Sequence, residues 1–182
     1  MTLFATNRQG YPSWEDMAVS LDEPLAAPDE LTLVTVLSKA IRQSASTLSV
    51  GIEISSHGRS RIDFVFVIPA ESSGENNVHV VGVEAKLTNW SRAFRQAYLN
   101  RLAVDVSFIA LPIQNVSPSV VRMGIELGIG ILGVAADQIH LVLPAHVGRP
   151  DSLLRDRVVS QLSKNRTRRT RPALPQLIEV GG

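Results

Sequence analysis

The sequence predicts a mixed α/β domain in which one β-sheet is flanked by helices. Runs rich in β-branched residues, such as 61–68 and 78–87, indicate strands because turn-forming residues bound them. Other stretches, such as 30–44 and 89–102, carry apolar residues at the spacing of a helix. The expected order is a helix, three consecutive strands, and then helices alternating with strands. This order predicts a mixed sheet with helices packed against it.

Composition limits the classes of protein to which the chain can belong. The 182 residues suffice for one domain with a core, and 45% hydrophobic with 19% charged residues is typical of a globular chain. There are no cysteines, which excludes disulfides and thiolate zinc sites. No apolar run reaches the ~18 residues of a spanning helix, and residues 1–10 lack the order of a signal peptide. We therefore expect a cytoplasmic protein with no membrane partner.

The chain is expected to divide into an irregular N-terminal arm (1–28), one folded domain (29–164) and a basic C-terminal tail (165–182). The arm contains several Gly and Pro residues and weak periodicity, whereas acids at the start of the first helix suit the helix dipole. Helices are expected at 30–44, 89–102, 117–127 and 151–164, and strands at 48–56, 61–68, 78–87, 105–112, 128–134 and 138–144.

The basic tail has two open interpretations. The stretch 164–171, where the domain passes into the tail, carries five positive charges and no acid, on Lys164, Arg166, Arg168, Arg169 and Arg171. It could contact the phosphates of a nucleic acid, or it could be a solvated tail without a partner. The net charge of the whole chain, +1, is not that of a general nucleic-acid coat.

Two acids and a lysine on neighbouring predicted strands are the most informative feature of the chain. Side chains alternate between the faces of a strand, so Glu84 and Lys86 point the same way, with Ala85 opposite. If the strands pair around the turn at 70–77, Asp63 can reach the same face. Charges are costly at the end of an apolar hairpin. The same residues could also form an ordinary exposed pair on a solvated strand.

These residue types suit metal-assisted hydrolysis of a phosphodiester. A hard divalent cation prefers carboxylate and carbonyl oxygens, which Asp63, Glu84 and the backbone of Ala85 could supply. A bound cation lowers the pKa of a water and polarises the phosphoryl group. Lys86 could orient that water or stabilise the developing charge. Mg²⁺ keeps several of its own waters, so a site with few protein ligands suits it.

The segment around these residues resembles the PD-(D/E)XK nuclease superfamily, which includes restriction endonucleases, Holliday-junction resolvases and repair nucleases. Asp63 takes the place of the motif aspartate, Glu84 that of the second acid and Lys86 that of the lysine. The similarity continues through a helix that carries Gln96 and into later strands, and it covers about residues 30–145. Ile62 stands where the family often has proline.

The resemblance implies a restriction-endonuclease-like core, DNA as the partner and Mg²⁺ or Mn²⁺ as the cofactor. Asp63, Glu84, Lys86 and Gln96 would then be catalytic. Glu30, on the first helix, matches a glutamate that helps to bind metal in many members of the superfamily.

Further polar residues could support this site. Glu53 comes near Asp63 if the first two strands pair, as a ligand or as a solvated strand residue. Arg61, Arg92 and Arg95 could contact the DNA backbone, or simply be exposed.

Three functions remain open from the sequence. The first is a metal-dependent DNA endonuclease of repair, recombination or defence. The second is a nuclease-like module that binds DNA or a protein without cleaving it, and the third is an enzyme acting on a small phosphoester. Nucleases that cut both strands commonly pair two sites, so we also expect a symmetric homodimer.

Overall fold

The computed structural model describes residues 30–43, 47–58, 60–70, 78–135 and 138–169. The expected N-terminal arm and residues 170–182 of the basic tail lie outside these ranges. The helices are α2 (Glu30–Gln43), α3 (Trp90–Asn100), α4 (Pro118–Leu127) and α5 (Ser152–Arg169), with a short 3₁₀ turn, η1 (Ile113–Asn115). The strands are β1 (Ser49–Ser55), β2 (Arg61–Pro69), β3 (Val78–Ala85), β4 (Val106–Pro112), β5 (Gly130–Ala135) and β6 (Gln138–Leu143).

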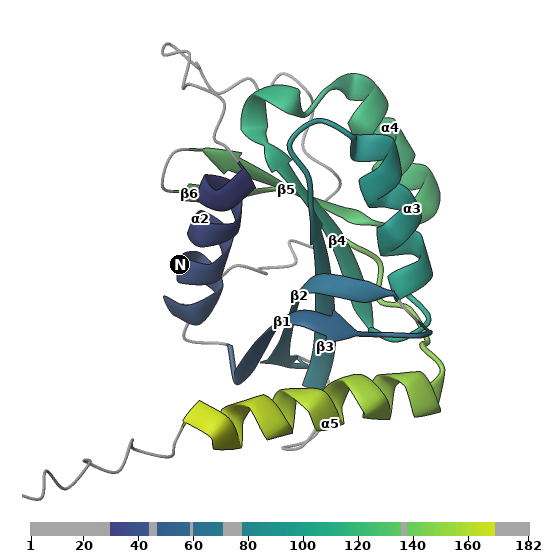
Figure 1. Ribbon diagram of the computed structural model, residues 1–182. Helices are drawn as coiled ribbons and strands as arrows, with labels where there is room; N and C mark the ends of the chain where they lie inside the picture. The colour runs from purple at the N-terminus through teal and green to yellow at the C-terminus, as the bar shows by residue number, and fades with distance from the viewer. Residues whose placement is uncertain (1–29, 44–46, 59, 71–77, 136–137, 170–182) are drawn as a thin grey trace, which may run out of the picture.

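The six strands form one mixed sheet in the order β1-β2-β3-β4-β5-β6 (Figure 1). The first three strands are antiparallel to one another, β3, β4 and β5 are parallel, and β6 returns antiparallel to β5. The α3 and α4 helices make the crossovers between the parallel strands. The predicted mixed α/β fold, a sheet flanked by helices, is therefore confirmed.

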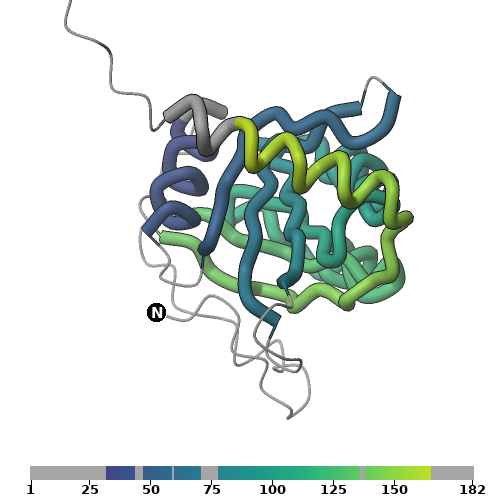
Figure 2. Tube along the Cα trace, turned by 90° about the horizontal axis from the view of Figure 1, so that it is seen from below, coloured from purple at the N-terminus to yellow at the C-terminus, as the bar shows by residue number. Residues whose placement is uncertain are grey.

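Helices cover both faces of the sheet. On one face, α2 packs its apolar stripe on even-numbered residues of β2 and odd-numbered residues of β3. On the other face, α3 and α4 cover β4 and β5, while α5 lies across β1 and β2 (Figures 1 and 2). None of the helices in the described ranges is long and apolar enough to cross a membrane.

The helices that flank the parallel strands begin where their sequences predict. The side chain of Asn89 accepts a hydrogen bond from the backbone N–H of Arg92 at 3.1 Å, which caps α3. Ser117 caps α4 in the same way, and Pro118 occupies its first turn. Several predicted ends need correction. The strand at 78–87 ends at Ala85, and the strand at 128–134 begins at Gly130. The helix at 89–102 ends at Asn100, and the helix expected to end at residue 164 continues to Arg169.

An ion pair ties α5 to the start of β3. Arg155 Nε lies 3.0 Å from both carboxylate oxygens of Asp105, and Arg155 Nη2 donates to the carbonyl of Val78 at 2.9 Å. Asp105 Oδ2 also accepts from the N–H of Val80 at 2.7 Å. Because these groups are only partly exposed, the pair holds α5 against the sheet.

The glycine at the start of β5 lies in a tightly packed part of the sheet. A methyl group added to Gly130 would meet ring carbons of Phe108, and it would lie 3.0 Å from Cβ of Ala145. We predict that Gly130→Ala lowers the free energy of unfolding by about 1–3 kcal/mol, because a filled core cannot accept the extra carbon without strain. Urea denaturation measures this change.

Gly148→Ala is the matched control, because its added methyl would come no closer than 3.5 Å to the carbonyl oxygen of Asp105. It should leave the unfolding free energy unchanged or slightly higher. Equal stability of the two variants would contradict the packing that the structure shows.

Candidate active site

The candidate site lies where β2 separates from β3. Pairing of these strands ends at Phe64 opposite Val83, so the next pair of residues, Asp63 and Glu84, lies outside the ladder. Asp63 Oδ2 instead accepts a hydrogen bond from the backbone N–H of Ala85 at 2.9 Å. The carboxylate therefore replaces the main-chain acceptor that a continuing strand would have supplied.

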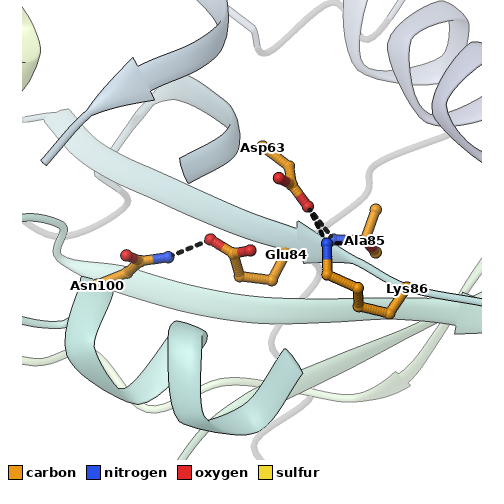
Figure 3. Close-up of polar contacts among 5 residues, drawn as sticks. All are labelled: Asp63, Glu84, Ala85, Lys86 and Asn100. Carbon is orange, nitrogen blue, oxygen red and sulfur yellow. Dashed lines mark hydrogen bonds and ion pairs between the residues drawn. The ribbon is translucent and has the colours of Figure 1, made fainter. Parts of the chain in front are cut away.

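The ammonium group of Lys86 contacts two oxygen atoms that the sequence predicts as metal ligands, one on Asp63 and one on Ala85. Lys86 Nζ is 3.2 Å from Asp63 Oδ2 and 2.9 Å from the carbonyl oxygen of Ala85 (Figure 3). Although Lys86 follows the end of β3, its backbone N–H still donates to the carbonyl of Ala110 in β4 at 3.0 Å. The sheet thus holds the main chain of the lysine.

Glu84 is fully buried on the face of the sheet that α3 covers. Its neighbours Val83 and Ala85 pack toward α2, and the alternation of side chains sends Glu84 the other way. Asn100, at the end of α3, donates from Nδ2 to Glu84 Oε1 at 2.6 Å (Figure 3). The second oxygen, Oε2, is buried and makes no hydrogen bond within the described ranges of the chain.

The surroundings of Glu84 favour its protonated form. Burial, and after it the nearby charge of Asp63, raise the pKa of Glu84 from 4.5 to about 7. The hydrogen bond from Asn100 and the charge of Lys86 act in the opposite direction and are weaker. A cation beside Glu84 would favour the ionised form, because it would compensate the charge that burial penalises.

Two amide side chains lie one helical turn apart on α3. Asn100 is 1% exposed, and its Oδ1 makes no hydrogen bond to the residues that the structure describes. The Oε1 of Gln96 is likewise buried and without a hydrogen bond to these residues. The role of Asn100 in holding Glu84 was not predicted, although its spacing from Gln96 placed both residues on one helix face. Arg92 and Arg95 of the same helix are exposed.

Glu53 and Asp63 lie between two pairs of the β1–β2 ladder, Ile52 with Phe64 and Ile54 with Ile62, but do not themselves form a pair. The backbone φ of Glu53, 54°, is in the left-handed region, which this residue alone adopts among the non-glycine residues of the described ranges. Glu53 and Asp63 line a cavity of about 80 Å³ together with Ala85. Arg61 pairs with Glu53 at 3.8 Å, but both side chains are more than half exposed, so the pair stabilises little.

We call the place where β2 separates from β3, at Asp63 and Ala85, the fork. Its oxygen atoms suit a hard divalent cation such as Mg²⁺ better than Zn²⁺, which prefers nitrogen and sulfur ligands. The potential donors are Asp63, Glu84 with its free Oε2, and the carbonyl of Ala85, all of them oxygens. The described part of the chain has no group of three or more His, Cys, Asp or Glu residues that could hold a metal. Glu30 is the first residue of α2, and its side chain lies outside what the structure describes.

The architecture places the chain in the class of mixed α/β proteins with a six-stranded sheet. No protein-family model matches the chain, and no curated protein sequence does so either. The structure is similar to that of SPO1766, a protein of unknown function from Silicibacter pomeroyi, with a TM-score of 0.54 and 17% identity over 81% of this chain and 90% of that chain. This similarity concerns the fold.

A second solved structure, Pyrococcus furiosus SfsA in complex with Ca²⁺, is a more distant match. It gives a TM-score of 0.31 and 14% identity over 63% of this chain and 61% of that chain.

The raised pKa of Glu84 predicts a pH-dependent stability. The folded protein holds this proton more tightly than the unfolded chain does. Stabilisation is therefore complete below about pH 4.5 and is lost as the pH rises through about 7. In chelated buffer, wild-type protein should lose up to about 3 kcal/mol relative to Glu84→Gln over this range. Urea denaturation at several pH values measures the difference.

Gln keeps the oxygen that accepts from Asn100 and removes the titrating group. Glu126→Gln, at an exposed position on α4, is the control and should follow the wild-type profile. Parallel pH profiles for wild type and Glu84→Gln would show that Glu84 does not titrate in this range.

Proposed function

We propose that the protein is a metal-dependent DNA endonuclease with a restriction-endonuclease-like core, acting in DNA repair, recombination or defence. The observation that carries the proposal is the fork at Asp63. There the ammonium of Lys86 lies within 3.2 Å of an acid and a carbonyl, beside a buried acid with a free oxygen. The order α2, β1, β2, β3, α3, β4 also agrees with the order that the sequence resemblance implies.

Each residue has a distinct part in this proposal. Asp63, Glu84 and the carbonyl of Ala85 would hold the cation, which when bound polarises the phosphoryl group and lowers the pKa of a water. Lys86 would donate to that water or to a phosphate oxygen, because its ammonium already lies beside two of the ligand oxygens. Gln96 would orient a water with its buried, unpartnered oxygen.

A nuclease-like module without turnover is the second candidate. The contacts of Lys86 favour it in one respect, since the ammonium bonds both Asp63 and the carbonyl of Ala85 and so competes with a metal for these oxygens. Such a protein would bind DNA or a partner protein but would cleave nothing. Cleavage assays on plain duplex, flap, junction, single-stranded DNA and RNA substrates, with a small phosphodiester beside them, separate these functions.

Metal binding is the first test of the site. Calorimetry should detect Mn²⁺ binding to wild-type protein, and the affinity should fall at least about tenfold in Asp63→Asn and in Glu84→Gln, because each loses an anionic ligand. In Asp63→Asn the amide oxygen would still accept from the N–H of Ala85, so the fork should survive this change. Glu126→Gln should bind as wild type does. A wild-type protein that neither binds Mn²⁺ nor cleaves DNA with Mg²⁺ or Mn²⁺ would rule out the proposed activity.

Lys86 is the second test. Lys86→Ala should lower the single-turnover rate of cleavage by at least about 10²-fold, because the charge that develops in the transition state loses its donor. DNA affinity should change little, and Mn²⁺ should bind at least as tightly, since the competing ammonium is gone. Lys39→Ala, on α2, is the control and should cleave normally. Cleavage by Lys86→Ala at the wild-type rate would remove Lys86 from the mechanism.

A further inference from the structure

A groove at the end of α3 shares no lining residue with the cavity at Glu53 and Asp63. One wall is the last turn of α3 and the turn after it, and the other is the chain that leads into α5. The cavity has a volume of about 280 Å³. We call it the Tyr98 groove, and its lining residues are Tyr98, Leu99, Arg101, Leu102, Gly148 and Arg149.

Backbone hydrogen bonds hold the two walls together. The N–H of Gly148 donates to the carbonyl of Asp105 at 2.7 Å, and the N–H of Asp151 donates to the carbonyl of Leu102 at 2.9 Å. On the other wall, Arg101 Nη1 donates to the carbonyl of Leu127 at 2.6 Å. Hydrogen bonds within the chain therefore hold the shape of the groove, and binding sites are commonly pre-formed in this way.

The groove offers an aromatic ring and two cations. Tyr98 is 52% exposed, and the guanidinium carbon of Arg101 lies 5.9 Å from the centre of its ring. Arg149 is exposed and makes no ion pair within the described part of the chain. The nearest acids in sequence are engaged elsewhere, since Asp105 pairs with Arg155 and Asp151 caps the start of α5. Within the described part of the chain, neither Arg101 nor Arg149 thus forms an ion pair.

We propose that the Tyr98 groove binds one unpaired nucleotide of a DNA strand, with its base against the ring of Tyr98 and its phosphate facing Arg101 and Arg149. Aromatic rings beside cationic side chains are the usual platform for unpaired nucleotides. Two further arginines on α3, Arg92 and Arg95, are also exposed and add positive charge to this helix.

The size of the groove selects an unpaired nucleotide over the other occupants. A volume of about 280 Å³ is near the lower limit of small-ligand pockets and holds a group the size of one nucleotide. Bases within a duplex are stacked on both faces and cannot reach a side-chain ring unless they leave the stack. A specific protein interface needs about 20–30 residues on each side, far more than line this groove. The inference deepens the proposed function and rests on it for the choice of DNA.

The test is binding of a fluorescent oligothymidylate and of a duplex of equal length, in chelated buffer so that no cleavage occurs. Tyr98→Leu should weaken single-strand binding at least about fivefold, because one stacked base is lost, and should change duplex binding by less than about twofold. Arg149→Gln should lower the salt dependence of single-strand binding by about 0.7 in log–log slope. Both side chains are exposed, so both variants should fold.

Arg42→Gln is the matched control, since Arg42 is exposed on α2, which covers the opposite face of the sheet. It should bind oligothymidylate as wild type does. Single-strand binding by Tyr98→Leu within about twofold of wild type, or competition by thymidine monophosphate as strong as that by the oligonucleotide, would overturn the inference. Because the assay needs no metal, the groove and the proposed cleavage can fail independently of each other.

Discussion

The separation of β2 from β3 at Asp63 is the constraint on which the candidate site depends. A buried backbone N–H needs an acceptor, and at Ala85 the partner strand no longer supplies one. The carboxylate of Asp63 takes that place at 2.9 Å. This single bond fixes the acid at the fork and leaves the carbonyl of Ala85 facing the ammonium of Lys86. One structural requirement thus positions three of the groups that the proposed chemistry needs.

Around the fork the protein retains features that do not serve stability. Glu84 is buried with one oxygen unpartnered, Gln96 and Asn100 each keep a buried free oxygen, and Glu53 adopts a left-handed backbone. Unpartnered polar atoms and strained residues are rare in folded proteins and cluster where a site binds something. The contact of Asn100 with Glu84, and the cavity shared by Glu53 and Asp63, support assigning function to the region where β2 and β3 separate.

The elements of the fold could be predicted because local signals defined them. Runs of β-branched residues marked the strands, and the helical spacing of apolar residues marked helices such as α3. The ends of elements were harder to place. Lys86 continues the strand pattern by residue type, but β2 has already left β3 there, and only the parallel neighbour β4 still bonds its backbone. Strand ends depend on partners that a linear pattern does not contain.

The order of the elements, and the placing of Asp63, Glu84 and Lys86 on neighbouring strands, could be read from the sequence because both follow from side-chain periodicity and from residue type. Only the tertiary structure decided the burial of Glu84, its bond to Asn100 and the groove at Tyr98 and Arg149. These features join segments that lie far apart in the sequence. The bond of Glu84 to Asn100 joins β3 to the end of α3, and the groove joins the end of α3 to the chain before α5. The physical reason is that burial, and hence the pKa of Glu84, depends on what packs over a residue rather than on its neighbours in sequence.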